Sequence, residues 1–151
     1  VASFLAYYFE MLFENVTLVK ATSEAEIFQQ MIHIDERDLA IGLSFPRYSH
    51  KATKAMQFAH NSGAKVVAIT DSAASPLAEF ADYTLLARSD IAAIADTLVA
   101  PLSLIDALIV TVAMKMEKTI GKTFGRLEQI WDEYHVYETI NPHEETPHAA
   151  R

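Results

Sequence analysis

The sequence contains no cysteine among its 151 residues. Disulfides and Cys-ligated metal sites are therefore excluded, and a reducing compartment is expected. Long hydrophobic runs are also missing, because charged side chains interrupt the two most apolar stretches, residues 4–13 and 102–116. Neither stretch predicts a membrane span. We expect a cytoplasmic protein without membrane contact.

Basic residues are scarce as well. Twelve Lys and Arg stand against twenty Asp and Glu, which gives a formal net charge of −8. This balance argues against broad electrostatic binding of a nucleic-acid backbone by the chain. The remaining composition, 51% hydrophobic and 21% charged, is typical of a globular domain with a sizeable core. We expect one domain over residues 1–138 and a mobile, proline-containing tail over residues 139–151.

The stretch from Asp38 to Ser75 has the pattern of a β–loop–α–β unit. Leu39–Leu43 and Val66–Ile69 are short apolar runs, and between them apolar residues recur with helical spacing until Gly63, where a helix would end. A crossover helix of this length makes the two strands parallel, and burial on both faces explains why neither strand alternates polar with apolar residues. Small ligands bind at the carboxyl ends of such strands.

Further elements are expected on both sides of this unit. They are helices over Val1–Glu14, Glu24–Ile34 and Pro76–Phe80, strands over Asn15–Val19 and Tyr83–Ala87, and helical segments around residues 102–116 and 124–134. Ser23 and Glu26 form a capping-box pattern, and Ser75 is expected as the N-cap before Pro76. The first helix and the 102–116 segment carry more apolar surface than one sheet face covers, so we expect a homodimer or tetramer.

The loop Ser44–His50 lies where a strand leads into a helix. Backbone N–H groups at the start of a helix favour an anion. Ser44 and Ser49 can donate hydroxyl hydrogens, and Arg47 can bind two oxygens of a phosphate at once. The alternative is that Ser49 is only an N-cap and Arg47 only a surface residue.

A second polar loop follows the neighbouring strand, and its residues Thr70, Asp71 and Ser72 could complete the rim of the same pocket, although Asp and Ser are equally common in ordinary turns. His50 could serve as a general acid or base, but a histidine without an evident carboxylate partner is more often structural. The candidate ligand-binding residues are Ser44, Arg47, Tyr48, Ser49, His50, Thr70 and Ser72. We predict no catalytic residue, no metal ligand and no cofactor.

The stretch DLAIGLSFPRYS and the segment KATKAMQFAHNSGAKVVAITDSAASPLAEFADYTLLA resemble the sugar isomerase (SIS) domain, especially the effector domain of RpiR-type bacterial transcriptional regulators. The resemblance covers about residues 1–116. It implies a Rossmann-like (flavodoxin-like) α/β fold, with five parallel strands flanked by helices. The family's first strand would precede Val1, so the resemblance implies an N-terminally truncated SIS domain with a gap between residues 15–19 and 39–43.

Family members place a phosphosugar at a loop of the form Ser-x-Ser-Gly-x-Thr/Ser, which falls here on Ser44, Pro46, Arg47 and Ser49. Pro46 replaces the second serine and Arg47 replaces the glycine. The resemblance implies an effector domain that senses a phosphorylated sugar, with DNA bound only through a helix-turn-helix domain that this chain does not contain. A phosphosugar isomerase is the alternative, and it would need an acid/base pair that the visible loops do not supply.

Overall fold

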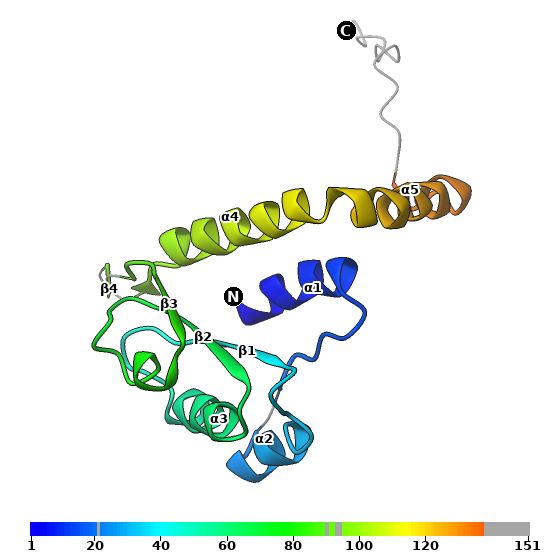
Figure 1. Ribbon diagram of the computed structural model, residues 1–151. Coiled ribbons are helices and arrows are strands. Elements are labelled where there is room, and N and C mark those ends of the chain that lie inside the picture. The colour runs from blue at the N-terminus through cyan, green and yellow to red at the C-terminus, as the bar shows by residue number, and fades with distance from the viewer. Residues whose placement is uncertain (21, 90, 93–94, 138–151) are drawn as a thin grey trace, which may run out of the picture. The chain divides into compact units, whose positions relative to one another are not determined.

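The computed structural model describes residues 1–20, 22–89, 91–92 and 95–137. Its helices are α1 (Ala2–Leu12), α2 (Glu24–Gln30), α3 (His50–Asn61), the 3-10 helix η1 (Ala78–Phe80), α4 (Val99–Lys115) and α5 (Glu117–Glu133) (Figure 1). Its strands are β1 (Leu39–Leu43), β2 (Lys65–Thr70), β3 (Tyr83–Leu86), β4 (Ile91–Ala92) and β5 (Ala95–Asp96). Two compact units divide the chain, residues 1–114 and residues 115–151, and the candidate site lies in the first.

The main sheet contains three parallel strands in the order β1-β2-β3. β1 pairs with β2 from Leu39 opposite Lys65 to Leu43 opposite Ile69. β2 pairs with β3 in the same direction, so β3 is an edge strand as the sequence predicted. The predicted β–α–β unit is confirmed, and Gly63, with φ +87°, ends the connection after α3 in a conformation that glycine adopts without strain. The short strands β4 and β5 form a separate antiparallel pair.

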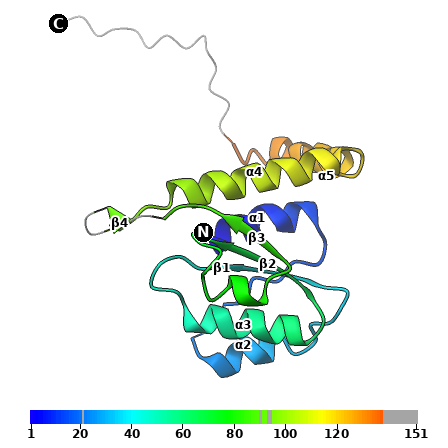
Figure 2. The ribbon, with the colours of Figure 1, turned by 60° about the vertical axis from the view of Figure 1, so that its left-hand side comes forward.

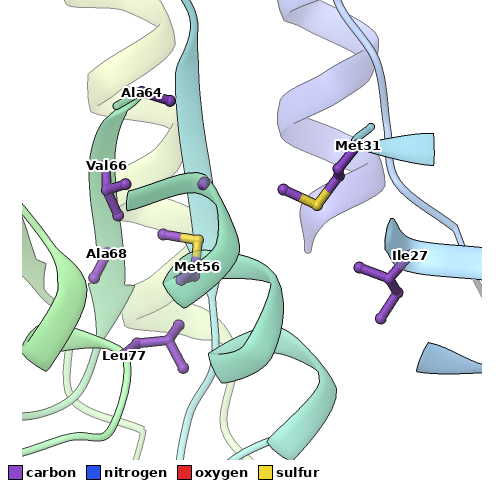
Figure 3. Close-up of a cluster of buried hydrophobic side chains, with 8 residues drawn as sticks. Ile27, Met31, Met56, Ala64, Val66, Ala68 and Leu77 are labelled. Carbon is purple, nitrogen blue, oxygen red and sulfur yellow. The ribbon is translucent and has the colours of Figure 1, made fainter. Parts of the chain in front are cut away.

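Helices cover both faces of this sheet, with α2 and α3 on one side and α1 and α4 on the other (Figure 2). Met56 of α3 packs with Val66 and Ala68 of β2 in the first core (Figure 3). In the second core, Ile69 of β2 packs with Leu5 of α1 and with buried isoleucines of α4. The expected α/β fold, a parallel sheet flanked by helices, is thus confirmed, although the main sheet of the described residues has three strands and not the five that the resemblance implies.

Several expected boundaries differ from the structure. The strand predicted over Asn15–Val19 is wrong: these residues follow α1 as an irregular segment, because β-branched residues form a strand only where a neighbour completes the hydrogen-bonded ladder. The helix predicted over Pro76–Phe80 is only η1, and Ser75 does not cap it. Instead, the Ser75 carbonyl accepts a hydrogen bond from the N–H of Ala78, while its buried hydroxyl has no partner among the described residues.

Some helices also have bounds that differ from the expected ones. α2 ends after Gln30 in a turn instead of reaching Ile34, and α5 begins at Glu117, directly after Met116, instead of near residue 124. The capping box at α2 is confirmed, since Ser23 Oγ accepts from the N–H of Glu26 and the Glu26 carboxylate accepts from the N–H of Ser23. The predicted tail over residues 139–151 lies outside the described residues, and the boundary at residue 138 stays a prediction.

Candidate functional site

The candidate site lies at the carboxyl ends of β1 and β2, which the parallel register places side by side. Leu43, the last residue of β1, is opposite Ile69, and the N–H of Ser44 donates to the carbonyl of Ile69 at 3.2 Å. The loops that follow the two strands therefore start from neighbouring points of the sheet. This is the edge at which open α/β sheets bind ligands.

Ser44 and Ser49 lie in direct contact at the start of α3. The N–H of Ser49 donates to Ser44 Oγ at 2.9 Å, and Ser49 Oγ in turn accepts from the N–H of Ala52 at 3.3 Å. Ser49 is the N-cap of α3, as the sequence predicted. Both hydroxyls act here as acceptors, and neither donates its own hydrogen to any of the described residues. Each can therefore still donate one hydrogen bond to a ligand.

The first turn of α3 contributes backbone donors. Among the described residues, none accepts a hydrogen bond from the N–H of His50 or of Lys51, whereas the N–H of Ala52 is taken up by the cap. These two groups carry the partial positive charge of a helix N-terminus. Together with the two serine hydroxyls they form a cluster of donors, which is an arrangement suited to an anion.

Arg47 is exposed and has φ 67°, one of two non-glycine residues in the described ranges with positive φ. The left-handed region costs an L-residue with a long side chain on the order of 1–2 kcal/mol. Arg47 thus keeps the backbone conformation that glycine adopts freely, and adds a guanidinium to the loop. Strain of this kind is concentrated at functional sites, although it does not prove one.

Tyr48 connects the two loops. Its hydroxyl donates to Asp71 Oδ1 at 2.8 Å, and this hydrogen bond, together with partial burial, raises the pKa of Tyr48. The buried hydroxyl of Thr70 donates to the same oxygen at 3.3 Å. The sequence analysis placed Tyr48 and Thr70 among the candidate ligand-binding residues and named Asp71 only as part of the rim, and the structure shows that Asp71 joins the two.

The candidates His50 and Ser72 make contacts away from the serine pair, as does the neighbouring Lys51. The ring nitrogen Nδ1 of His50 lies 3.3 Å from Glu24 Oε1, so this histidine does have a carboxylate partner, on α2. The ammonium group of Lys51 donates to the backbone carbonyl of Thr22, on the same side. Ser72 Oγ accepts from the N–H of Ala74 at 3.1 Å and so stabilises its own turn.

A groove of about 770 Å³ lies elsewhere in the first unit, between the segment after α1 and the edge of β1. Its walls are mainly apolar and include Val16, Leu18, Ile41, Leu108 and Val112. None of the seven candidate residues lines it. The groove occupies the place where the sequence predicted a gap, between residues 15–19 and β1.

Two further findings concern only the residues that the structure describes. No helix among them is long and apolar enough to cross a membrane. No three His, Asp or Glu side chains in the described ranges are placed to hold a metal ion. Asp106 of α4 is exposed in the single chain.

Comparison with known sequences places these features in a family. The model of the SIS domain matches residues 1–111. A stretch of 60 residues is 38% identical to an uncharacterised HTH-type transcriptional regulator of Haemophilus influenzae, covering 40% of this chain and 21% of that protein. The chain thus spans about a fifth of the length of this relative.

Solved structures resemble the chain in fold. The sugar isomerase domain of an RpiR transcription factor from Sphaerobacter thermophilus has a TM-score of 0.77 at 23% identity, over 85% of this chain and 71% of that one. The NanR protein of Vibrio vulnificus, solved with ManNAc-6P, has a TM-score of 0.70 at 15% identity, over 87% and 50%. A candidate phosphosugar isomerase from Bacillus subtilis has a TM-score of 0.54 at 21% identity, over 89% and 42%.

Proposed function

The chain belongs to the SIS domain family, and from this premise we propose that it is the effector domain of an RpiR-type transcriptional regulator and that its effector is a phosphorylated sugar. The family match covers residues 1–111, one of the similar structures is named an RpiR transcription factor, and the Haemophilus influenzae relative is named an HTH-type transcriptional regulator. The NanR structure contains a sugar phosphate, which is the class of ligand we propose here. DNA binding would belong to a helix-turn-helix domain, as in the HTH-type relative.

The observation that carries the proposal is the donor cluster at the start of α3. The N–H groups of His50 and Lys51 and the hydroxyls of Ser44 and Ser49 are donors to which the described residues offer no acceptor. A phosphate dianion supplies enough acceptor oxygens for all four, and Arg47 of the same loop adds positive charge. Hydrogen bonds to a charged group contribute about 1.5–3 kcal/mol each.

A regulatory role is favoured over catalysis because no histidine–carboxylate pair among the described residues faces the donor cluster. His50 and Glu24 form such a pair, but it is exposed, with 75% and 48% of the two side chains accessible, and it faces α2. Incubation with aldose and ketose phosphates should therefore give no interconversion. Turnover is a real possibility to test, because one of the similar structures is named a candidate phosphosugar isomerase. Turnover that His50→Asn abolishes would overturn the regulatory assignment.

Calorimetric titration of the intact protein with hexose and amino-sugar 6-phosphates tests the binding proposal. Ser44→Ala and Ser49→Ala should each weaken the tightest binder about tenfold to a hundredfold, because each removes one donor to the phosphate. Ser62→Ala is the matched control, since Ser62 lies at the opposite end of α3 and donates to the carbonyl of Phe58. It should leave the affinity unchanged.

Melting curves must accompany these titrations. Ser49→Ala also removes the N-cap of α3, at a cost of about 1 kcal/mol, and Ser44→Ala leaves the N–H of Ser49 without its acceptor. Both variants should nevertheless remain folded at 25 °C. Unchanged affinity in both folded variants would show that this loop is not the phosphate site.

A further inference from the structure

The carboxylate of Asp71 is held from one side only. Tyr48 and Thr70 both donate to Oδ1, at 2.8 and 3.3 Å, whereas no described residue donates to Oδ2. An ionised carboxylate accepts hydrogen bonds and donates none, so Oδ2 keeps its full capacity to accept. The side chain is therefore fixed in position while one of its oxygens is available.

This oxygen lies at the same sheet edge as the donor cluster. Asp71 follows β2 directly, Ser44 follows β1 directly, and the Tyr48–Asp71 hydrogen bond joins the two loops. The two halves of this edge have opposite character: hydrogen-bond donors at the start of α3, and an acceptor after β2. A phosphate is attracted to the first and repelled by the second, whereas a neutral hydroxyl can donate to the carboxylate.

We infer that Asp71 binds the hydroxyl-bearing end of the ligand and selects sugar phosphates whose sugar part is uncharged, called neutral sugar phosphates below, over phosphorylated sugar acids. Oδ2 accepts a hydrogen bond from a sugar hydroxyl while the phosphate lies at the start of α3, and Tyr48 positions the carboxylate. This inference rests on the proposed function, because it assumes that a sugar phosphate occupies the site. The sugar hydroxyl bound by Asp71 belongs to the part of the ligand that the donor cluster does not contact.

Asp71→Asn is the sharpest perturbation. The amide retains an oxygen that can accept from Tyr48, but it replaces Oδ2 by an NH₂ group, which donates and carries no charge. Binding of the tightest neutral sugar phosphate should weaken about tenfold to a hundredfold. Binding of inorganic phosphate should stay the same. The affinity for 6-phosphogluconate, whose carboxylate would face Asp71, should rise relative to the affinity for the neutral sugar phosphate when the variant is compared with the unaltered protein.

Tyr48→Phe separates positioning from direct contact. It removes the 2.8 Å hydrogen bond but keeps the carboxylate, so it should weaken the neutral sugar phosphate less than Asp71→Asn does and leave inorganic phosphate unaffected. A purely structural role for Asp71 predicts another pattern, in which the melting temperature falls and inorganic phosphate binding weakens in parallel. That pattern would overturn the inference.

The titrations use the intact protein with inorganic phosphate, glucose 6-phosphate, glucosamine 6-phosphate, ManNAc-6P and 6-phosphogluconate. If no sugar phosphate in this panel binds, the proposed function fails. If a neutral sugar phosphate binds and Asp71→Asn changes neither its affinity nor the discrimination against 6-phosphogluconate, the inference fails while the proposed function stands.

Discussion

Replacing Gly42 by alanine tests the contact that fixes α3 against the sheet. A Cβ atom at Gly42 would overlap Sδ of Met56 and would lie 2.7 Å from its Cε and 2.8 Å from its Cγ. The Met56 side chain is only 3% exposed and packs among Val66, Ala68 and Leu77 (Figure 3), so it cannot move aside into solvent. Gly42 does not have positive φ, so space and not backbone conformation requires glycine here.

The expected cost follows from this overlap. Forcing a methyl group into a packed core costs about 1–3 kcal/mol of unfolding free energy. Met56→Ala alone should cost about 2–5 kcal/mol, because it leaves a cavity. In the Met56→Ala background, Gly42→Ala should cost nothing or stabilise slightly, since its methyl group enters the cavity. The double-mutant cycle should therefore give a coupling energy of about 1–3 kcal/mol.

Urea unfolding of the four proteins measures the cycle, with the slope of each transition checked for constancy. Gly121→Ala is the control: a Cβ there meets nothing within 4 Å, and replacing an exposed helical glycine should stabilise α5 by up to about 1 kcal/mol. If Gly42→Ala costs the same with and without the Met56 side chain, the packing of α3 on β1 described above is wrong.

Two more predictions concern charge and assembly. Asp82 accepts hydrogen bonds from Lys65 Nζ and from the N–H of Val66, and both lower the pKa of its carboxyl group. The resulting stabilisation of the fold is present above the unfolded pKa of 3.8 and is lost as the pH falls through the lower pKa of the folded state. Asp82→Asn should therefore make the free energy of unfolding depend less on pH in that range. If Asp82→Asn leaves the acid limb unchanged, the carboxylate is not stabilising. Exposed apolar side chains on α1 and α4, such as Tyr7 and Met114, lead us to expect at least a dimer by light scattering at micromolar concentration, and a monomer would contradict this.

The central β–α–β unit was predictable from the sequence because each part has its own local signal. The two strands are short apolar runs, Ser49 caps the helix between them, and Gly63 ends it. Asn15–Val19 shows the limit of such signals. Its residues favour a strand, but a strand forms only with a neighbour to pair with, and neighbours are a property of the whole fold.

The site was predictable only in part, for a related reason. Ser44 and Ser49 are five positions apart on one loop, so their contact follows from the turn. The hydrogen bond between Tyr48 and Asp71 spans 23 positions, and the contact of His50 with Glu24 spans 26. No periodicity marks such pairs, and an aspartate after a strand looks like an ordinary turn residue.

The most direct measurement of the central claim is the response of single backbone amides to the ligand. In ¹H–¹⁵N spectra of the intact protein, titration with the tightest hexose 6-phosphate should shift the His50 and Lys51 amide signals saturably, because both N–H groups gain a charged acceptor. The non-phosphorylated sugar should leave them in place at the same concentration. If the His50 and Lys51 signals stay fixed while the sugar phosphate binds and shifts signals elsewhere, the start of α3 is not the phosphate site.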